Sequence, residues 1–256
     1  MDAELPLAGR HAVITGASRG IGAAIATRLA GMGAQTTLIG RDRRALERQA
    51  SGDRNARAVV CDVTDPVEVE RAFAEARERM PIAILINNAG AAESAPFQKT
   101  SDAMLERMLA VNLGAAFRCA RAALPSMIET GWGRIVNIAS IAGLRGYPYV
   151  TAYVAAKHAL VGFTRALAME TARKGITVNA VCPGYTDTEL VRNSVATIVA
   201  KTGRSESEAL HELIRHNPQA RLIRPEEVAD AVAWLCGPGA DSITGQAIAV
   251  AGGEIM

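Results

Sequence analysis

The segment Thr15-Gly-Ala-Ser-Arg-Gly-Ile-Gly22 separates an apolar run, residues 11–15, from an Ala-rich stretch over residues 20–32. The short β-branched run is typical of a buried strand, and the Ala-rich stretch is typical of a helix. Three glycines at such a junction permit a tight turn and let the backbone approach a pyrophosphate closely, while the helix start supplies free N–H donors. The segment therefore predicts a dinucleotide-binding cradle, although its glycine spacing is wider than G-x-G-x-x-G.

Beyond this segment, short β-branched runs alternate with longer amphipathic stretches along the chain. Strands are expected at residues 11–15, 36–39, 57–61, 82–86, 134–138, 176–181 and 247–251. Helices are expected at residues 20–32, 42–49, 64–80, 102–110, 113–129, 153–173, 189–201, 205–216 and 225–236. Alternation of apolar strands with helices predicts a parallel sheet covered on both faces. We therefore expect an α/β fold with a Rossmann-type, doubly wound parallel sheet of about seven strands.

One segment, residues 185–222, interrupts this alternation. It is charged, it is longer than a simple connection should be, and it contains two of the expected helices. Long insertions in compact domains are often lids or binding loops, so we expect a small helical substrate lid; a surface excursion without function stays open. Because the chain has no linker, repeat or low-complexity stretch, residues 1–256 are expected to form a single dinucleotide-binding domain.

The composition excludes several other classes of protein. A hydrophobic content of 49% with 21% charged residues is typical of a globular protein, and a net charge of +2 gives no argument for nucleic acid or acidic membranes. The apolar runs are too short to span a bilayer, and acids stand at the start where a signal peptide would be basic. The four cysteines share no metal or redox spacing. We expect a cytoplasmic protein without a metal, a membrane or a nucleic-acid partner.

A second motif overlaps the glycine segment. Residues 16–20 also match G-x-S-x-G, the nucleophile elbow of α/β-hydrolases, in which Ser18 would attack an ester. His158, His211 or His216 would then complete a triad. This alternative assigns no role to Gly22, the third glycine of the segment. His211 and His216 also superficially resemble a zinc helix, but they are five residues apart, where a zincin requires four.

Tyr153 and Lys157 lie four residues apart in a stretch rich in Ala, Val and Leu. In a helix, both side chains would lie on one face, one turn apart. A Tyr titrates near about 10, and a nearby positive charge lowers that pKa by stabilising the phenolate. The pair could therefore give and take a proton near neutral pH, although an ordinary helix with one buried Tyr and one exposed Lys would look the same.

Five motifs occur in one order along the chain: the glycine segment, Asn87-Asn-Ala-Gly90, Ser140, Tyr153-x-x-x-Lys157 and Pro183-Gly184. In this combination the chain resembles the short-chain dehydrogenase/reductase family, from Leu7 to its end. The resemblance implies an NAD(P)-dependent enzyme that interconverts a ketone and a secondary alcohol. Two rival functions are the hydrolase and a dinucleotide-binding regulator without catalytic activity. A regulator would need only the cradle and not Ser140, Tyr153 and Lys157.

The resemblance also implies roles for individual residues. Tyr153 would be the proton donor and acceptor, Lys157 would bind the nicotinamide ribose and lower the pKa of Tyr153, and Ser140 would hydrogen-bond the substrate carbonyl. Asn112 would position the lysine and a proton-relay water. The expected catalytic residues are thus Ser140, Tyr153, Lys157 and Asn112. The other residues expected to contact the cofactor are Gly16, Ser18, Arg19, Gly20, Ile21, Gly22, Arg41, Asp62, Val63, Asn88, Ala89, Gly90, Pro183, Gly184, Thr186 and Thr188.

Two arginines bear on the choice of dinucleotide. An acid at the end of the second strand would favour NAD, but the expected strand is followed by Gly40 and Arg41. Asp42 is better placed as the N-cap of the next helix. Arg41, with Arg19 of the glycine segment, could hold a 2′-phosphate. NADP(H) is therefore favoured, while NAD(H) stays possible, as it would if both arginines were ordinary surface charges.

The substrate side is expected to be largely apolar. Its expected lining residues, besides Ser140 and Tyr153, are Ala92, Leu144, Tyr147, Tyr185 and Leu190. An apolar wall suits an acyl chain, and the pattern resembles the branch of 3-oxoacyl reductases, polyketide ketoreductases and 3-hydroxyacyl-CoA dehydrogenases. A 3-oxoacyl or 3-hydroxyacyl thioester is thus expected; a cyclic ketone, a polyketide, 3-hydroxybutyrate and a sugar are alternatives.

Four basic residues of the expected lid could contact the phosphates of coenzyme A or a carrier-protein arm, although they could equally belong to a solvated helix face. They are Arg192, Lys201, Arg204 and Arg215. The resemblance further implies a homotetramer that packs through the long helices on either side of Ser140 and through the C-terminal segment, although the apolar runs of these helices would equally suit the core of a monomer.

Overall fold

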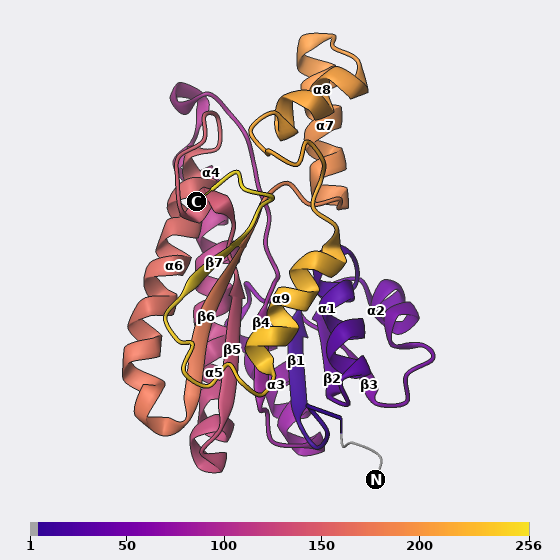
Figure 1. Cartoon of the computed structure of the whole chain (residues 1–256), viewed down its shortest axis with the longest axis vertical. Coiled ribbons are helices and arrows are strands. Elements are labelled where there is room, and N and C mark those ends of the chain that lie inside the picture. The colour runs from indigo at the N-terminus through magenta and orange to yellow at the C-terminus, as the bar shows by residue number, and fades with distance from the viewer. Residues whose placement is uncertain (1–4, 256) are drawn as a thin grey trace.

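Seven parallel strands form one sheet in the computed structural model, which describes residues 5–255 (Figure 1). The order of the strands across the sheet is β3-β2-β1-β4-β5-β6-β7. The strands are β1 (His11–Thr15), β2 (Gln35–Gly40), β3 (Ala56–Val60), β4 (Ile84–Asn87), β5 (Gly133–Ile138), β6 (Ile176–Pro183) and β7 (Ala247–Val250). The doubly wound parallel sheet expected from the alternation is confirmed, and every expected strand is present with its ends shifted by at most two residues.

Helices connect consecutive strands and cover both faces of the sheet. They are α1 (Gly20–Gly31), α2 (Arg43–Ala50), α3 (Pro66–Arg79), α4 (Asp102–Leu109), α5 (Ala115–Thr130), α6 (Thr151–Thr171), α7 (Glu189–Thr202), α8 (Glu206–Ile214) and α9 (Pro225–Cys236). Shorter helical turns are η1 (Phe97–Lys99), η2 (Ala110–Gly114), η3 (Ile141–Gly143) and η4 (Ala172–Lys174). The two helices expected at 102–110 and 113–129 differ from the prediction, because η2 is a π-helical turn that joins α4 and α5 without a break.

Alternate residues of the central strands pack into two cores, one on each face. On one face, Ile14 of β1 packs in a cluster with Ile25 of α1 and Val232 of α9. On the other face, Val13 lies in a cluster with Phe73 of α3. These side chains are almost completely buried, and burying one of them contributes about 1.5–3 kcal/mol. The apolar strands therefore fix the sheet from both sides.

The chain reverses its direction of winding between β1 and β4, which are neighbours in the sheet although far apart in sequence. At such a switch point, the connections leaving the carboxyl ends of the two strands diverge and open a crevice. The glycine segment follows β1 there, and Asn88 follows β4. Helices α7 and α8 project beyond the same end of the sheet (Figure 1). Among the described residues, no helix is long and apolar enough to cross a membrane.

Candidate active site

The glycine segment forms a closely packed turn between β1 and α1. Gly16 and Gly20 both have positive φ, at 64° and 57°, a conformation that glycine adopts without strain. A Cβ atom on Gly22 would lie 2.3 Å from the Gly16 carbonyl oxygen and 2.5 Å from Asn88 Nδ2. A side chain at Gly22 would therefore force the turn open. This fits the prediction of a cradle that needs close backbone approach.

The segment after β4 holds this turn in place. Asn88 Nδ2 donates to the carbonyl oxygens of Thr15, at 3.0 Å, and Gly16, at 3.1 Å. The Thr15 hydroxyl accepts from the backbone N–H groups of Asn88 and Ala89, at 3.0 and 3.1 Å. Asn88 and Ala89, expected at the cofactor, thus act on the glycine turn itself. Thr15 was not among the expected site residues, although it stands at the start of the motif.

Asp62 and Val63 follow β3 on the same side of the sheet. The Asp62 carboxylate accepts hydrogen bonds from the backbone N–H of Thr64, at 2.9 Å, and from its hydroxyl, at 2.7 Å. The backbone hydrogen bond is the largest cause that lowers the pKa of Asp62. Asp62 is therefore an ionised, fixed hydrogen-bond acceptor at the edge of the crevice, and Val63 beside it is buried.

The residues expected to choose between NAD(H) and NADP(H) lie at the end of β2 and in the glycine turn. Asp42 caps α2 by accepting from Ala45 N at 3.1 Å, as expected. This capping role occupies one oxygen of the acid nearest to the strand end. Arg41 is exposed beside it. Arg19 is also exposed, and its guanidinium lies 2.5 Å from the Glu189 carboxylate at the start of α7. Arg19 would have to leave Glu189 to hold a phosphate.

Ser140 stands at the carboxyl end of β5. Its hydroxyl accepts from Ala142 N at 3.1 Å, so that it caps the short turn η3. The side chain is half-buried. Because this contact uses a lone pair of the hydroxyl oxygen, the hydroxyl proton can be donated to another acceptor.

Tyr153 and Lys157 lie one turn apart in α6, and Lys157 Nζ is 5.7 Å from the centre of the Tyr153 ring. Burial raises the pKa of Tyr153 to about 12, and the Ser140 hydroxyl opposes this rise. Burial also lowers the pKa of Lys157 to about 8. Burial thus sets the direction of the Tyr153 pKa in this arrangement, and Lys157 Nζ donates to the carbonyl oxygen of Ile138 at 2.8 Å. The lowering of the Tyr153 pKa by Lys157 stays a prediction.

Asn112 lies in the π-helical turn η2. Its Nδ2 donates to the carbonyl oxygens of Ala91, at 2.9 Å, and Met108, at 3.0 Å. Its Oδ1 accepts from Ala91 N at 3.3 Å. A Cβ atom on Gly90 would lie 2.8 Å from Asn112 Oδ1 and 3.6 Å from Lys157 Nζ. The structure thus brings the side chains of Asn112 and Lys157 close to the same face of Gly90, and their joint action stays a prediction.

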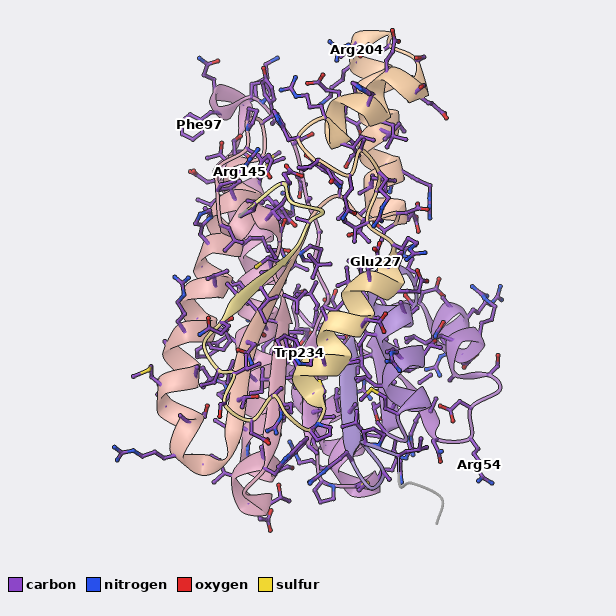
Figure 2. The ribbon with its side chains drawn as sticks, viewed as in Figure 1. Arg54, Phe97, Arg145, Arg204, Glu227 and Trp234 are labelled. Atoms are coloured by element: carbon purple, nitrogen blue, oxygen red, sulfur yellow. The ribbon has the colours of Figure 1, made fainter. Side chains whose placement is uncertain are left out.

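The substrate side is more polar than expected. The Tyr147 hydroxyl donates to Glu254 Oε1 at 2.7 Å, and the guanidinium carbon of Arg145 lies 4.6 Å from the centre of the Tyr147 ring. Arg145 lies at the end of the molecule that carries the lid helices (Figure 2). Ala92 and Leu144 are half-buried, whereas Leu190 is exposed. Glu254 was missed because nothing in its local sequence places it near Tyr147.

The lid helices carry mostly paired charges. Arg192 lies 2.6 Å from Asp187. Glu212 forms ion pairs with Arg215, at 2.6 Å, and with Arg204, at 3.7 Å. These pairs favour the solvated helix face over the expected phosphate contacts for three of the four basic residues.

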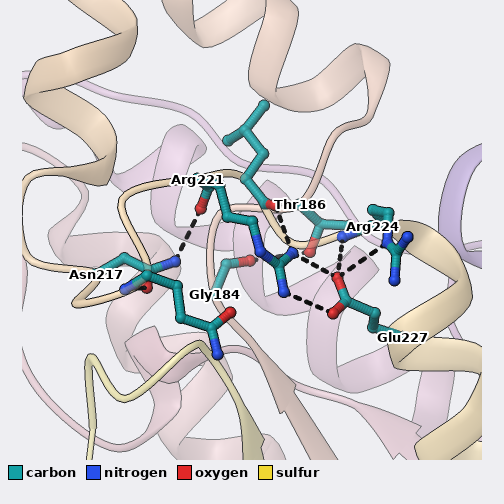
Figure 3. Close-up of polar contacts among 8 residues, drawn as sticks. Gly184, Thr186, Asn217, Arg221, Arg224 and Glu227 are labelled. Atoms are coloured by element: carbon teal, nitrogen blue, oxygen red, sulfur yellow. Dashed lines mark hydrogen bonds and ion pairs between the residues drawn. The ribbon is translucent and has the colours of Figure 1, made fainter.

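The segment that returns from the lid to α9 is held by a fork of hydrogen bonds. Arg221 donates to both oxygens of Glu227, each at 2.7 Å, and the backbone N–H of Arg224 donates to the same carboxylate at 2.8 Å (Figure 3). The Arg221 guanidinium is the largest cause that lowers the pKa of Glu227 to about 2. Asn217 Nδ2 donates to the Arg221 carbonyl oxygen at 2.8 Å. Near the start of the lid, the Thr186 hydroxyl donates to the Gly184 carbonyl oxygen at 3.0 Å.

The hydrolase alternative finds no support in the geometry. Within residues 5–255, no hydrogen bond joins Ser18 to a histidine; His158 Nδ1 instead contacts the Val154 carbonyl oxygen at 2.9 Å. His211 lies in α8 of the lid and His216 just beyond it. The same residues contain no cluster of His, Cys, Asp and Glu able to hold a metal ion.

Comparisons with known proteins found similar sequences and structures. A model of the short chain dehydrogenase family matches residues 10–198. The chain is 37% identical over 252 residues to the D-beta-hydroxybutyrate dehydrogenase of Rhizobium meliloti, covering 95% of this chain and 98% of that protein. It is 35% identical over 252 residues to the 3-oxoacyl-[acyl-carrier-protein] reductase of Escherichia coli, covering 97% and 98%. The crystal structure of an actinorhodin polyketide ketoreductase variant with NADPH matches with a TM-score of 0.92 at 38% identity, covering 96% and 97%.

Proposed function

Because the chain belongs to the short-chain dehydrogenase family and is an oxidoreductase acting on CH–OH groups, we propose that it interconverts a 3-oxoacyl and a 3-hydroxyacyl thioester. The observation that carries the proposal is the meeting of Ser140, Tyr153 and Lys157 where β5 ends and α6 begins. The 3-oxoacyl-[acyl-carrier-protein] reductase and the polyketide ketoreductase among the similar proteins support the thioester class.

The family binds NAD(P), and the residues present fit a dinucleotide. The glycine turn leaves no room for a Cβ at Gly22, which suits a backbone surface that a pyrophosphate approaches closely. When bound, the cofactor supplies the hydride that reduces the carbonyl carbon. Asp62, Gly90 and Thr188 are the residues we propose to contact its adenine, ribose and nicotinamide ends.

The protein itself contributes two hydroxyl groups, those of Ser140 and Tyr153, that act on the substrate carbonyl oxygen. As hydride reaches the carbonyl carbon, negative charge develops on the carbonyl oxygen, and hydrogen bonds donated there stabilise the transition state. Ser140 is the donor that stays protonated. Tyr153 transfers its proton to the oxygen in reduction and takes one back in oxidation. A Tyr153 pKa of about 12 suits the protonated form, which reduction requires.

We propose NADP(H) as the preferred dinucleotide. Arg41 is exposed just after β2, and Arg19, which is part of the glycine segment, could join Arg41 at a 2′-phosphate after release from Glu189. Asp42 is engaged at the start of α2. An NADPH-linked enzyme of this kind would run toward the alcohol.

We also propose a single dinucleotide-binding domain with residues 185–222 as its lid, assembled as a homotetramer. Phe117 of α5 and Met169 of α6 are large apolar side chains that are 50% and 85% exposed. Phe117 contacts Phe163 of α6, with ring centres 5.6 Å apart. Exposed apolar side chains on two adjacent helices are typical of a protein interface. Light scattering of wild-type protein and of Met169→Glu tests the assembly, which should be a tetramer that the variant weakens.

The test of the reaction is the replacement Tyr153→Phe. It removes one oxygen and should lower NADPH-linked ketone reduction by about 10²–10⁴-fold, the usual contribution of a positioned proton donor. Binding of NADP⁺ should be nearly unchanged. Wild-type enzyme would be screened at the nicotinamide absorbance band against 3-oxoacyl thioesters, cyclic ketones, sugars and 3-hydroxybutyrate with both cofactors. Unchanged turnover in the variant would exclude the mechanism, and turnover of a sugar but no thioester would exclude the substrate class.

A further inference from the structure

The residues after β7 bring a buried carboxylate to the substrate side of the site. Gly252 and Gly253 have φ values of 61° and 90°, which turn the chain sharply. A Cβ atom on Gly252 would lie 2.3 Å from Asn217 Oδ1, so the turn is packed against the end of the lid. The Glu254 side chain that follows is only 1% exposed.

Glu254 contacts two side chains of the loop between η3 and α6. Its Oε1 accepts from the Tyr147 hydroxyl at 2.7 Å and lies 3.7 Å from an Arg145 nitrogen. Burial raises the pKa of Tyr185, which lies on the segment that follows β6, and the Glu254 carboxylate raises it further. Tyr185 in turn raises the pKa of Tyr153. Arg145 and Tyr147 belong to the segment that joins Ser140 to Tyr153, so the buried carboxylate contacts the loop between two of the proposed catalytic residues.

The charges of Glu254 and Arg145 cancel each other. A buried carboxylate without a counter-ion is strongly destabilising, and Arg145 is the cation that pairs with Glu254. The Arg145 side chain is 40% exposed and rests on the Tyr147 ring. Within residues 5–255, its guanidinium makes no hydrogen bond to another residue. It therefore offers hydrogen-bond donors beside the site, while Glu254 removes the net positive charge that would attract an anion.

On the basis of the proposed function, we propose that Glu254 makes this enzyme select an uncharged ester or thioester over the corresponding free acid. An uncharged carbonyl can accept hydrogen bonds from Arg145 and leave the local charge at zero. A carboxylate in the same place would share one guanidinium with Glu254 and leave one uncompensated negative charge. Glu254 acts here as a positioning residue and charge partner, and it takes no part in proton transfer.

Two variants with opposite expected effects test this inference. Ethyl acetoacetate and acetoacetate are a matched pair of 3-oxo compounds, one neutral and one anionic, and the readout is the ratio of their kcat/KM values with NADPH. Glu254→Gln keeps an acceptor for Tyr147 but leaves Arg145 uncompensated, so the ester-to-acid ratio should fall at least about tenfold, which is the effect of one charge about 12 Å away at an effective dielectric constant near 20. Arg145→Gln should raise the ratio.

A charge change far from the site is the control. Glu170→Gln removes an exposed carboxylate at the opposite end of α6, roughly 25 Å from Tyr153 at about 1.5 Å per residue, and should leave the ratio unchanged. Circular dichroism and NADP⁺ binding establish that each variant is folded; if Arg145→Gln does not fold, Glu254→Gln decides alone. An unchanged ratio in Glu254→Gln, or shifts of the same sign in both variants, would overturn the inference.

Failure of the proposed function gives a different result. If wild-type enzyme reduces neither probe, the proposed 3-oxoacyl substrate is wrong. The inference is then tested by binding, with saturation-transfer NMR of the two probes on the NADP⁺ complex. The wild-type complex should bind the ester in preference to the acid, and Glu254→Gln should gain acid binding. No gain of acid binding would overturn it.

Discussion

Replacing the buried Lys157 by Met should make the protein without cofactor more stable at neutral pH, although it should abolish catalysis. Lys157 is 4% exposed, and burial lowers its pKa from 10.5 to about 8. At about 1.36 kcal/mol for each factor of ten in proton affinity, carrying the charge at pH 7 costs about 3 kcal/mol. Met has a similar length and no charge, so it avoids this cost.

The variant also loses a favourable contact. Lys157 Nζ donates to the Ile138 carbonyl oxygen at 2.8 Å, and such a hydrogen bond contributes about 1 kcal/mol. The net gain of Lys157→Met at pH 7 should therefore be about 2 kcal/mol. With an m-value of about 2 kcal/mol/M, the urea midpoint should rise by about 1 M.

The pH dependence of the stability difference shows whether the charge of Lys157 is its cause. Because the pKa of Lys157 is lower in the folded than in the unfolded protein, the wild-type protein binds fewer protons when folded, and its stability rises with pH between about 8 and 10.5. The advantage of Lys157→Met should thus be constant below pH 8 and shrink between pH 8 and 10.5. Urea unfolding at several pH values and one protein concentration measures this.

A second lysine provides the control. Lys174, just before β6, is exposed, so Lys174→Met should change the free energy of unfolding by less than about 0.5 kcal/mol at any of these pH values. A loss of stability in Lys157→Met at pH 7, or a difference from wild type that does not depend on pH, would refute the argument from burial.

Three further changes have defined outcomes. Gly22→Ala should abolish dinucleotide binding, because the added Cβ would lie 2.3 Å from the Gly16 carbonyl oxygen, whereas Gly31→Ala on the same helix meets no atom within 4 Å and should bind normally in a calorimetric titration. Arg41→Ala should weaken NADP⁺ binding by about tenfold or more, the usual effect of losing a charge-assisted hydrogen bond, and leave NAD⁺ unchanged; equal loss for both would contradict the cofactor proposal. Glu227 has a folded pKa of about 2 against 4.5, so its stabilisation is present above pH 4.5 and lost as the pH falls toward 2. Thermal unfolding of Glu227→Gln should lack that part of the pH dependence, and an identical profile would show that the fork contributes nothing.

Much of the fold could be predicted from the sequence because its signals are local. The apolar runs and Ala-rich stretches lie where the strands and helices form, and Asp42 and Pro66 occupy the helix-start positions that their chemistry favours. Residues grouped by one motif, such as the glycine segment, were also found together. In these cases neighbours in sequence determine the structure.

The features that could not be predicted from the sequence depend on contacts between distant segments. Glu254 reaches Tyr147 only because two glycines turn the chain after β7. The low pKa of Lys157 follows from burial, which no pattern around Lys157 specifies. Arg192 and Arg204 could be recognised as charges, but their acidic partners could be identified only once the lid was folded.

The turn η2 makes the number of residues in this part of the chain as important as their identity. Helices α4 and α5 are continuous through it, with one turn wound more widely than the rest. Deleting one residue there would close the wide turn into an ordinary helical one, which absorbs the missing residue without a large rotation of α4 relative to α5 but shifts Asn112 from the position in which it donates to Ala91 and Met108. Substitutions at Ala110 should be far better tolerated than any deletion. An engineer who shortens loops to stabilise this enzyme should therefore leave the length of residues 102–130 untouched.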